Sequence, residues 1–142
     1  MSFVLGFDFG LNSIGTALGN TITRTVRPLK AVRAKNGRPD DNALEDLVRQ
    51  WQPSLLVVGL PLMMDGSEQP LTQRARGFAK MLNKRFAIEV KLVDERLSTK
   101  EAKELIFERG GFRALARDKG AVDNMSAAVI LQEYFDSYCP FD

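Results

Sequence analysis

Large apolar residues recur at every second position at the start of the chain, which predicts a strand over 3–9. Alternate residues of a strand share a face. One face carries Phe3, Leu5, Phe7 and Phe9, and the other carries Val4, Gly6, Asp8 and Gly10. We interpret the two glycines as open space that lets a ligand or metal approach the backbone on the face of Asp8. The alternative is a structural Asp8 that lies at the strand end and accepts hydrogen bonds from the turn.

The pattern along the rest of the chain predicts an α/β fold. Strands over 13–20 and 21–32 follow, with turns at Gly10 and Gly19-Asn20, and complete an antiparallel meander. The expected elements after it are helix 41–51, strand 55–60, helix 69–85, strand 88–94, helix 98–109, a loop over 109–120 and helix 121–137. This order favours a single domain over 1–142 with a mixed, five-stranded sheet flanked by helices.

Composition excludes several classes of site. The chain of 142 residues has no histidine and a single cysteine. Ser-His-Asp and Cys-His catalysis and zinc sites built from several His and Cys ligands are therefore excluded. Acid-base work in an enzyme of this composition falls to carboxylates, lysine, tyrosine or a metal-bound water. With no secretory signal, no membrane span and no disulfide partner for Cys139, we expect a cytoplasmic protein.

Two further acids stand where a ligand site could form. Glu95 follows the strand expected at 88–94, and parallel strands tend to present binding groups at their carboxyl ends. Asp123 falls in the first turn of the last helix, where the helix dipole favours negative charge. Taken singly, each has a simpler interpretation: a surface ion pair of Asp94 or Glu95 with Arg96, and a helix cap for Asp123.

Four motifs give the chain a family resemblance. They are "GFDFGLNSIGTA" at 6–17, "VVGLPLMMDGSE" at 57–68, "VDERLST" at 93–99 and "VDNMSAAVILQEY" at 122–134. In this order they resemble the bacterial family of pre-16S ribosomal RNA nucleases, formerly described as Holliday junction resolvases, within the ribonuclease H-like superfamily. The chain departs from the family pattern at Asn12 and Ser13, where a basic residue is usual, at Met63 and at Ser126.

The resemblance implies a ribonuclease H-like fold and a metal-dependent nuclease. Asp8, Glu95 and Asp123 then form the catalytic set and hold Mg²⁺ or Mn²⁺, and the implied substrate is structured RNA, including pre-rRNA on ribosomal particles. Carboxylates suit this role because Mg²⁺ prefers oxygen ligands and binds through one or two carboxylates plus substrate phosphates. The alternatives are a resolvase of four-way DNA junctions, a non-catalytic nucleic-acid-binding domain and a nucleotide-binding domain of the actin-like or sugar-kinase type.

Basic residues are grouped, although the formal net charge is only +2. Six stand between Arg24 and Arg38 with no acid among them. Arg76, Lys80 and Lys84 share a face of the helix expected at 69–85, and Arg113, Arg117 and Lys119 precede Asp123. Basic groups beside an acidic site suit a nucleic-acid backbone. We expect the last two groups to bind substrate, the alternative being solvated charged surfaces.

Overall fold

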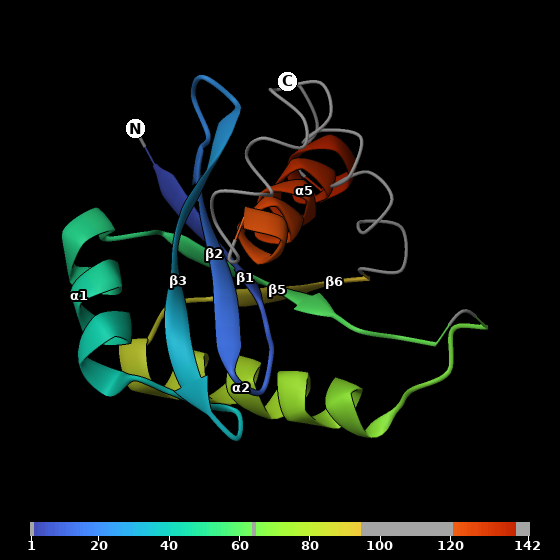
Figure 1. The fold of residues 1–142 in the computed structure, drawn as a ribbon. Helices are drawn as coiled ribbons and strands as arrows, with labels where there is room; N and C mark the ends of the chain where they lie inside the picture. The colour runs from blue at the N-terminus through green and yellow to red at the C-terminus, as the bar shows by residue number, and fades with distance from the viewer. Residues whose placement is uncertain (1, 64, 95–120, 139–142) are drawn as a thin grey trace.

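The computed structural model describes residues 2–63, 65–94 and 121–138, and shows a sheet with helices on both faces (Figure 1). The strands are β1 (Phe3–Asp8), β2 (Ser13–Asn20), β3 (Thr25–Lys35), β4 (Arg38–Pro39), β5 (Leu55–Leu60) and β6 (Val90–Asp94). The helices are α1 (Asp41–Trp51), α2 (Pro70–Phe86) and α5 (Ala121–Tyr138). The helix expected at 98–109 and the loop expected at 109–120 lie outside the described residues.

The sheet is mixed, with the strand order β4-β3-β2-β1-β5-β6. The segment from β1 to β4 is an antiparallel meander, whereas β5 pairs in parallel with both β1 and β6. Six strands therefore stand in the described residues where the sequence predicted five. The additional strand, β4, arises because Asn36 and Gly37, with φ of 50° and 83°, turn the chain back on β3. Positive φ at both central residues is typical of the tight hairpin turn that an Asn-Gly pair favours.

The two faces of the sheet bury different side chains, as the alternation in β1 predicts. Leu5, Phe7 and Phe9 belong to one buried cluster together with residues of α1 and α2. Val4, between Phe3 and Leu5, belongs to a second cluster that includes residues of α5. In Figure 1, α5 accordingly lies on one side of the sheet, and α1 and α2 lie on the other.

Two glycines let α5 approach the sheet closely. A Cβ added at Gly6 would lie 2.5 Å from Cγ of Leu131, and one added at Gly19 would lie 2.8 Å from Cζ of Phe135. Leu131 and Phe135 are 0% and 1% exposed, so these contacts are part of the core. The interpretation of Gly6 and Gly10 as open space for a ligand is therefore wrong. The missing side chain of Gly6 makes room for Leu131, and a Cβ at Gly10 would clash with the backbone carbonyl oxygen of Ser13.

Helix α5 buries its small residues against the sheet. Ser126, Ala127 and Ala128 are all buried, and α5 packs mainly against β1, β2 and β3. No helix in the described parts of the chain is long and apolar enough to cross a membrane.

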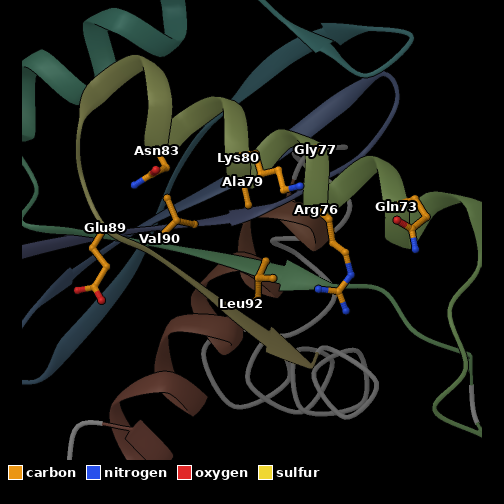
Figure 2. A pocket seen from close by; sticks show the side chains of 9 residues that line it. All are labelled: Gln73, Arg76, Gly77, Ala79, Lys80, Asn83, Glu89, Val90 and Leu92. Atoms are coloured by element: carbon orange, nitrogen blue, oxygen red, sulfur yellow. The ribbon is translucent and has the colours of Figure 1, made fainter.

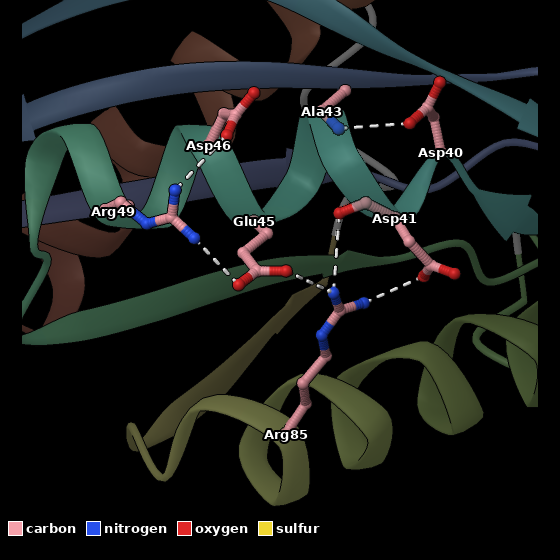
Figure 3. A network of polar contacts seen from close by, with 7 residues as sticks. All are labelled: Asp40, Asp41, Ala43, Glu45, Asp46, Arg49 and Arg85. Atoms are coloured by element: carbon pink, nitrogen blue, oxygen red, sulfur yellow. Dashed lines mark hydrogen bonds and ion pairs between the residues drawn. The ribbon is translucent and has the colours of Figure 1, made fainter.

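Polar contacts join α1 to α2 on the opposite face (Figure 3). The side chain of Asp40 accepts a hydrogen bond from the backbone N–H of Ala43 and caps α1, a role that aspartate commonly has at a helix N-terminus. Arg85 of α2 donates to Oδ1 of Asp41 at 2.8 Å and to Oε2 of Glu45 at 3.3 Å. These contacts fix α1 beside the end of α2.

Candidate active site

Asp8 is the last residue of β1 and lies half-buried at one edge of the sheet. Its chain neighbours Phe7 and Phe9 both pack in the cluster on the α1–α2 side, so the Asp8 side chain faces the α5 side. Its cross-strand partner in β2 is Gly15, which has no side chain. The structure thus puts a carboxylate on the α5 face beside a position without a side chain.

The three parallel strands end together at this edge. Phe7 of β1 is level with Val58 of β5, and Val58 is level with Leu92 of β6. Asp94, the last residue of β6, pairs with Leu60 of β5. The edge formed by the carboxyl ends of β1, β5 and β6 is therefore the one that carries Asp8, as in other open sheets with a ligand site.

Backbone hydrogen bonds hold the loop that follows Asp8. The N–H of Ala34 donates to the carbonyl of Asn12 at 3.0 Å, and the N–H of Gly37 donates to the carbonyl of Leu11 at 2.8 Å. The β1–β2 loop is thereby attached to the β3–β4 hairpin. These bonds satisfy backbone polar groups on the carboxyl side of Asp8 and fix the position of the loop relative to β3.

The loop after β5 is a turn at the same edge. The backbone N–H of Met63 donates to the carbonyl of Ser67 at 2.9 Å, and Gly66 has a φ of 89°. Oδ1 of Asp65 accepts from the backbone N–H of Ser67 at 2.9 Å, which closes the turn further. This segment follows the carboxyl end of β5, and Met63 in it remains 48% exposed.

Helix α5 runs in the opposite direction to β1. Leu131 lies over Gly6, whereas Phe135, one turn later, lies over Gly19, the partner of Val4. The part of α5 that precedes Leu131 therefore extends from the middle of β1 toward the edge at which Asp8 lies. Asp123 is in the first turn of α5, as predicted, but its side chain is outside the described residues.

The other expected metal ligand, Glu95, follows Asp94 in the sequence and lies outside the described residues. Within 2–63, 65–94 and the described side chains of α5, no three His, Cys, Asp or Glu side chains gather as a metal site. The described part of the candidate site thus consists of Asp8 and the edge around it. An oxygen-donating carboxylate at this edge has the chemistry that Mg²⁺ requires.

The basic residues of α2 belong to a helix that packs on the face of the sheet opposite to the one that Asp8 faces. Arg76 and Lys80 line a surface cavity of about 630 Å³ between α2 and β6 (Figure 2). Nε of Arg76 donates to Oε1 of Glu68 at 2.6 Å, which the sequence pattern did not predict. Lys84 is exposed but does not line the cavity. Arg113, Arg117 and Lys119 are outside the described residues.

Known proteins identify the fold and the family. The family model described as "RuvX: Holliday junction resolvase" matches residues 2–137. A protein of Cronobacter sakazakii named "Putative pre-16S rRNA nuclease" is 58% identical over 135 residues, which cover 95% of this chain and 96% of that protein. A relative from Escherichia coli with the same name is 58% identical over 133 residues, which cover 94% and 95% of the two chains.

Two solved resolvases share the fold at low sequence identity. Thermus thermophilus RuvC in complex with a Holliday junction substrate superimposes with a TM-score of 0.58 at 13% identity, covering 97% of this chain and 96% of RuvC. The fowlpox virus resolvase in complex with Holliday junction DNA gives a TM-score of 0.63 at 10% identity, covering 97% and 99%. The fold is therefore ribonuclease H-like, as the sequence predicted, and the chain belongs to the RuvX family.

Proposed function

We propose that this protein is a metal-dependent nuclease that hydrolyses phosphodiester bonds in structured RNA, with processing of the 5′ end of pre-16S ribosomal RNA as its main role. The observation that carries the proposal is Asp8 at the carboxyl edge of the parallel strands, in a chain 58% identical to relatives named for this activity. Such an enzyme would act in the cytoplasm, with pre-rRNA on ribosomal particles as its partner.

The proposed site consists of three carboxylates. Asp8, Glu95 and Asp123 would hold Mg²⁺ or Mn²⁺, and the described geometry of β1, β6 and α5 supports this grouping because all three elements lead to one edge. A bound metal would stabilise charge on the scissile phosphate and make water a better nucleophile. The carboxylates themselves would accept hydrogen bonds from that water and orient it, since the chain has no histidine for this task.

The proposed substrate contacts are charged side chains. Lys80 and Lys84 are exposed on α2, and Arg76 lies on the same helix with its side chain 41% exposed. Because this helix is on the face opposite Asp8, we propose that these residues meet the nucleic-acid backbone away from the scissile bond. Arg113, Arg117 and Lys119 complete the proposed set, in the segment that precedes Asp123 in the sequence.

A second candidate function is resolution of four-way DNA junctions. The description of the matching family model and the RuvC-like fold favour it. A non-catalytic nucleic-acid-binding domain is the third candidate. All three candidate functions use a basic surface that binds nucleic acid, so a binding measurement alone does not distinguish them.

The test is a cleavage assay on two substrates side by side. The purified protein is incubated with a precursor 16S RNA fragment and with a DNA four-way junction, in Mg²⁺, in Mn²⁺ and in EDTA. We expect metal-dependent cleavage of the RNA and none in EDTA. Preferential cutting of the junction would support the resolvase, binding without cleavage would support the non-catalytic domain, and full cleavage in excess chelator would contradict the metal mechanism.

A further inference from the structure

Arg33 of β3 lies on the same face of the sheet as Asp8. Its chain neighbours Val32 and Ala34 both pack in the cluster on the α1–α2 side, so the Arg33 side chain faces the α5 side. Its cross-strand partner is Ser13, which stands two residues before Gly15, the partner of Asp8. The row from Asp8 through Gly15 and Ser13 to Arg33 therefore has only small residues between the acid and the base.

The separation can be worked out from the strand register. Asp8 and Arg33 are two strand spacings apart, about 10 Å, and two residues apart along the strands, about 7 Å. Their Cα atoms are therefore about 12 Å apart on one face. Phosphates of one helical strand follow each other at about 3.4 Å of axial rise, so this distance corresponds to a few nucleotides.

Hydrogen bonds fix the backbone around Arg33, whereas the Arg33 side chain is exposed and unpaired among the described residues. The hydrogen bonds from Ala34 to Asn12 and from Gly37 to Leu11 fix β3 against the loop after Asp8. The carbonyl of Arg33 accepts a hydrogen bond from the backbone N–H of Asp40 at 2.8 Å. The Arg33 side chain is exposed and has no ion-pair or hydrogen-bond partner among the described residues.

Lys35 extends the same row. It stands two residues beyond Arg33, so it shares that face, and it is also exposed and unpaired within the described chain. The basic stretch from Arg24 to Arg38 was visible in the sequence, but the cross-strand register that brings Arg33 to the face of Asp8 was not. Other members of the stretch have different surroundings: the Arg27 guanidinium lies over the Trp51 ring at 5.3 Å.

We infer that Arg33 and Lys35 form a phosphate-binding row that guides the substrate backbone across β2 and β3 to Asp8. The inference rests on the proposed nuclease function and adds the direction from which the strand reaches the site. An arginine suits this position because its planar guanidinium binds two phosphate oxygens at once. The α2 residues cannot take this role next to Asp8, because α2 packs on the opposite face.

The test compares single variants in the intact chain. Binding to a fluorescein-labelled RNA hairpin with a single-stranded 5′ extension is followed by fluorescence anisotropy in EDTA, over a range of salt concentrations. The variants are Arg33→Ala, Arg33→Lys and Lys35→Ala. Arg49→Ala is the matched control, because it removes the same charge from an exposed side chain of α1. Thermal unfolding of each variant shows whether the fold is intact.

We expect Arg33→Ala and Lys35→Ala each to lower the slope of log K against log salt by about 0.7–0.9. Arg33→Lys should restore most of the slope, and Arg49→Ala should match the wild type. Equal slopes for Arg33→Ala and Arg49→Ala, or a wild type that does not bind the hairpin, would overturn the inference. Cleavage by the wild type is measured separately in Mg²⁺. If the wild type cleaves and the variants keep its salt slope, only the phosphate-binding row is refuted. If the variants have a lower salt slope but the wild type never cleaves, only the nuclease function is refuted.

Discussion

Replacing Gly6 by alanine tests whether α5 is fixed against the sheet by the absence of a side chain. The added Cβ would lie 2.5 Å from Cγ of Leu131 and 3.1 Å from both of its Cδ atoms. Carbon atoms in contact normally stand about 3.5–4.0 Å apart, so the shortfall at Cγ is about 1 Å or more. Leu131 is 0% exposed and cannot turn into solvent to relieve it.

The expected cost is that of overpacking a close-packed core, about 1–3 kcal/mol. In a domain of this size it should lower Tm by about 3–10 °C. Cleavage should fall as well, because α5 leads to the edge at which Asp8 lies and any outward shift of the helix changes that edge. The measurement is urea or thermal unfolding of the variant beside the wild type, with cleavage of the precursor RNA in parallel.

Two further variants make the reasoning refutable. Gly77→Ala is the control, because a Cβ at this helical position meets nothing within 4 Å and should stabilise the protein by about 0.4–1 kcal/mol. Leu131→Ala alone should cost about 2–5 kcal/mol. Combined with Gly6→Ala, it should cost at least about 1 kcal/mol less than the sum of the single changes. A Gly6→Ala protein as stable as Gly77→Ala would show that Leu131 does not occupy this space.

Two other predictions concern the surface and the hairpin. Replacing Arg76, Lys80 and Lys84 together by alanine should reduce the slope of log K against log salt for RNA binding by about 0.7–0.9 for each phosphate that the protein no longer neutralises. Sequence preference should not change. An unchanged slope in anisotropy titrations would mean that this helix face meets only solvent. Gly37→Ala should destabilise the fold by at least about 1 kcal/mol in urea unfolding, because φ is 83° at this position and a positive φ is unfavourable for alanine. An unchanged free energy of unfolding would contradict the observed turn.

Regular periodicity explains why most elements could be predicted. Large apolar residues at every second position gave the two faces of β1, and 3.6-residue spacing gave α1 over 41–51 and α2 within one residue of its observed ends. The third strand was less well predicted: it was expected at 21–32 but runs from Thr25 to Lys35. The local signal for its true end, the Asn36-Gly37 pair, was present in the sequence and would also have indicated β4.

Contacts between distant segments explain what could not be predicted. The role of Gly6 depends on Leu131, which is 125 positions away, and the alternation of β1 contains nothing about it. The pairing of Arg76 with Glu68 joins a helix to the turn before it, so helical spacing alone could not show it. The position of Asp8 at the carboxyl edge was easier to predict from the sequence, because it follows from strand order and parallel pairing.

The most direct test of the central claim is Asp8→Asn, which keeps the shape of the side chain and removes its charge. If Asp8 serves catalysis, cleavage of precursor RNA in Mg²⁺ should be abolished while the variant still binds RNA. Its unfolding free energy in EDTA should be unchanged or raised by about 0.5–2 kcal/mol, as often happens when a functional group is replaced. If Asp8 is structural, the substitution should instead lower the free energy of unfolding by about 1–3 kcal/mol. An Asp8→Asn protein that melts clearly lower and still cuts at the wild-type rate per folded molecule would contradict the assignment.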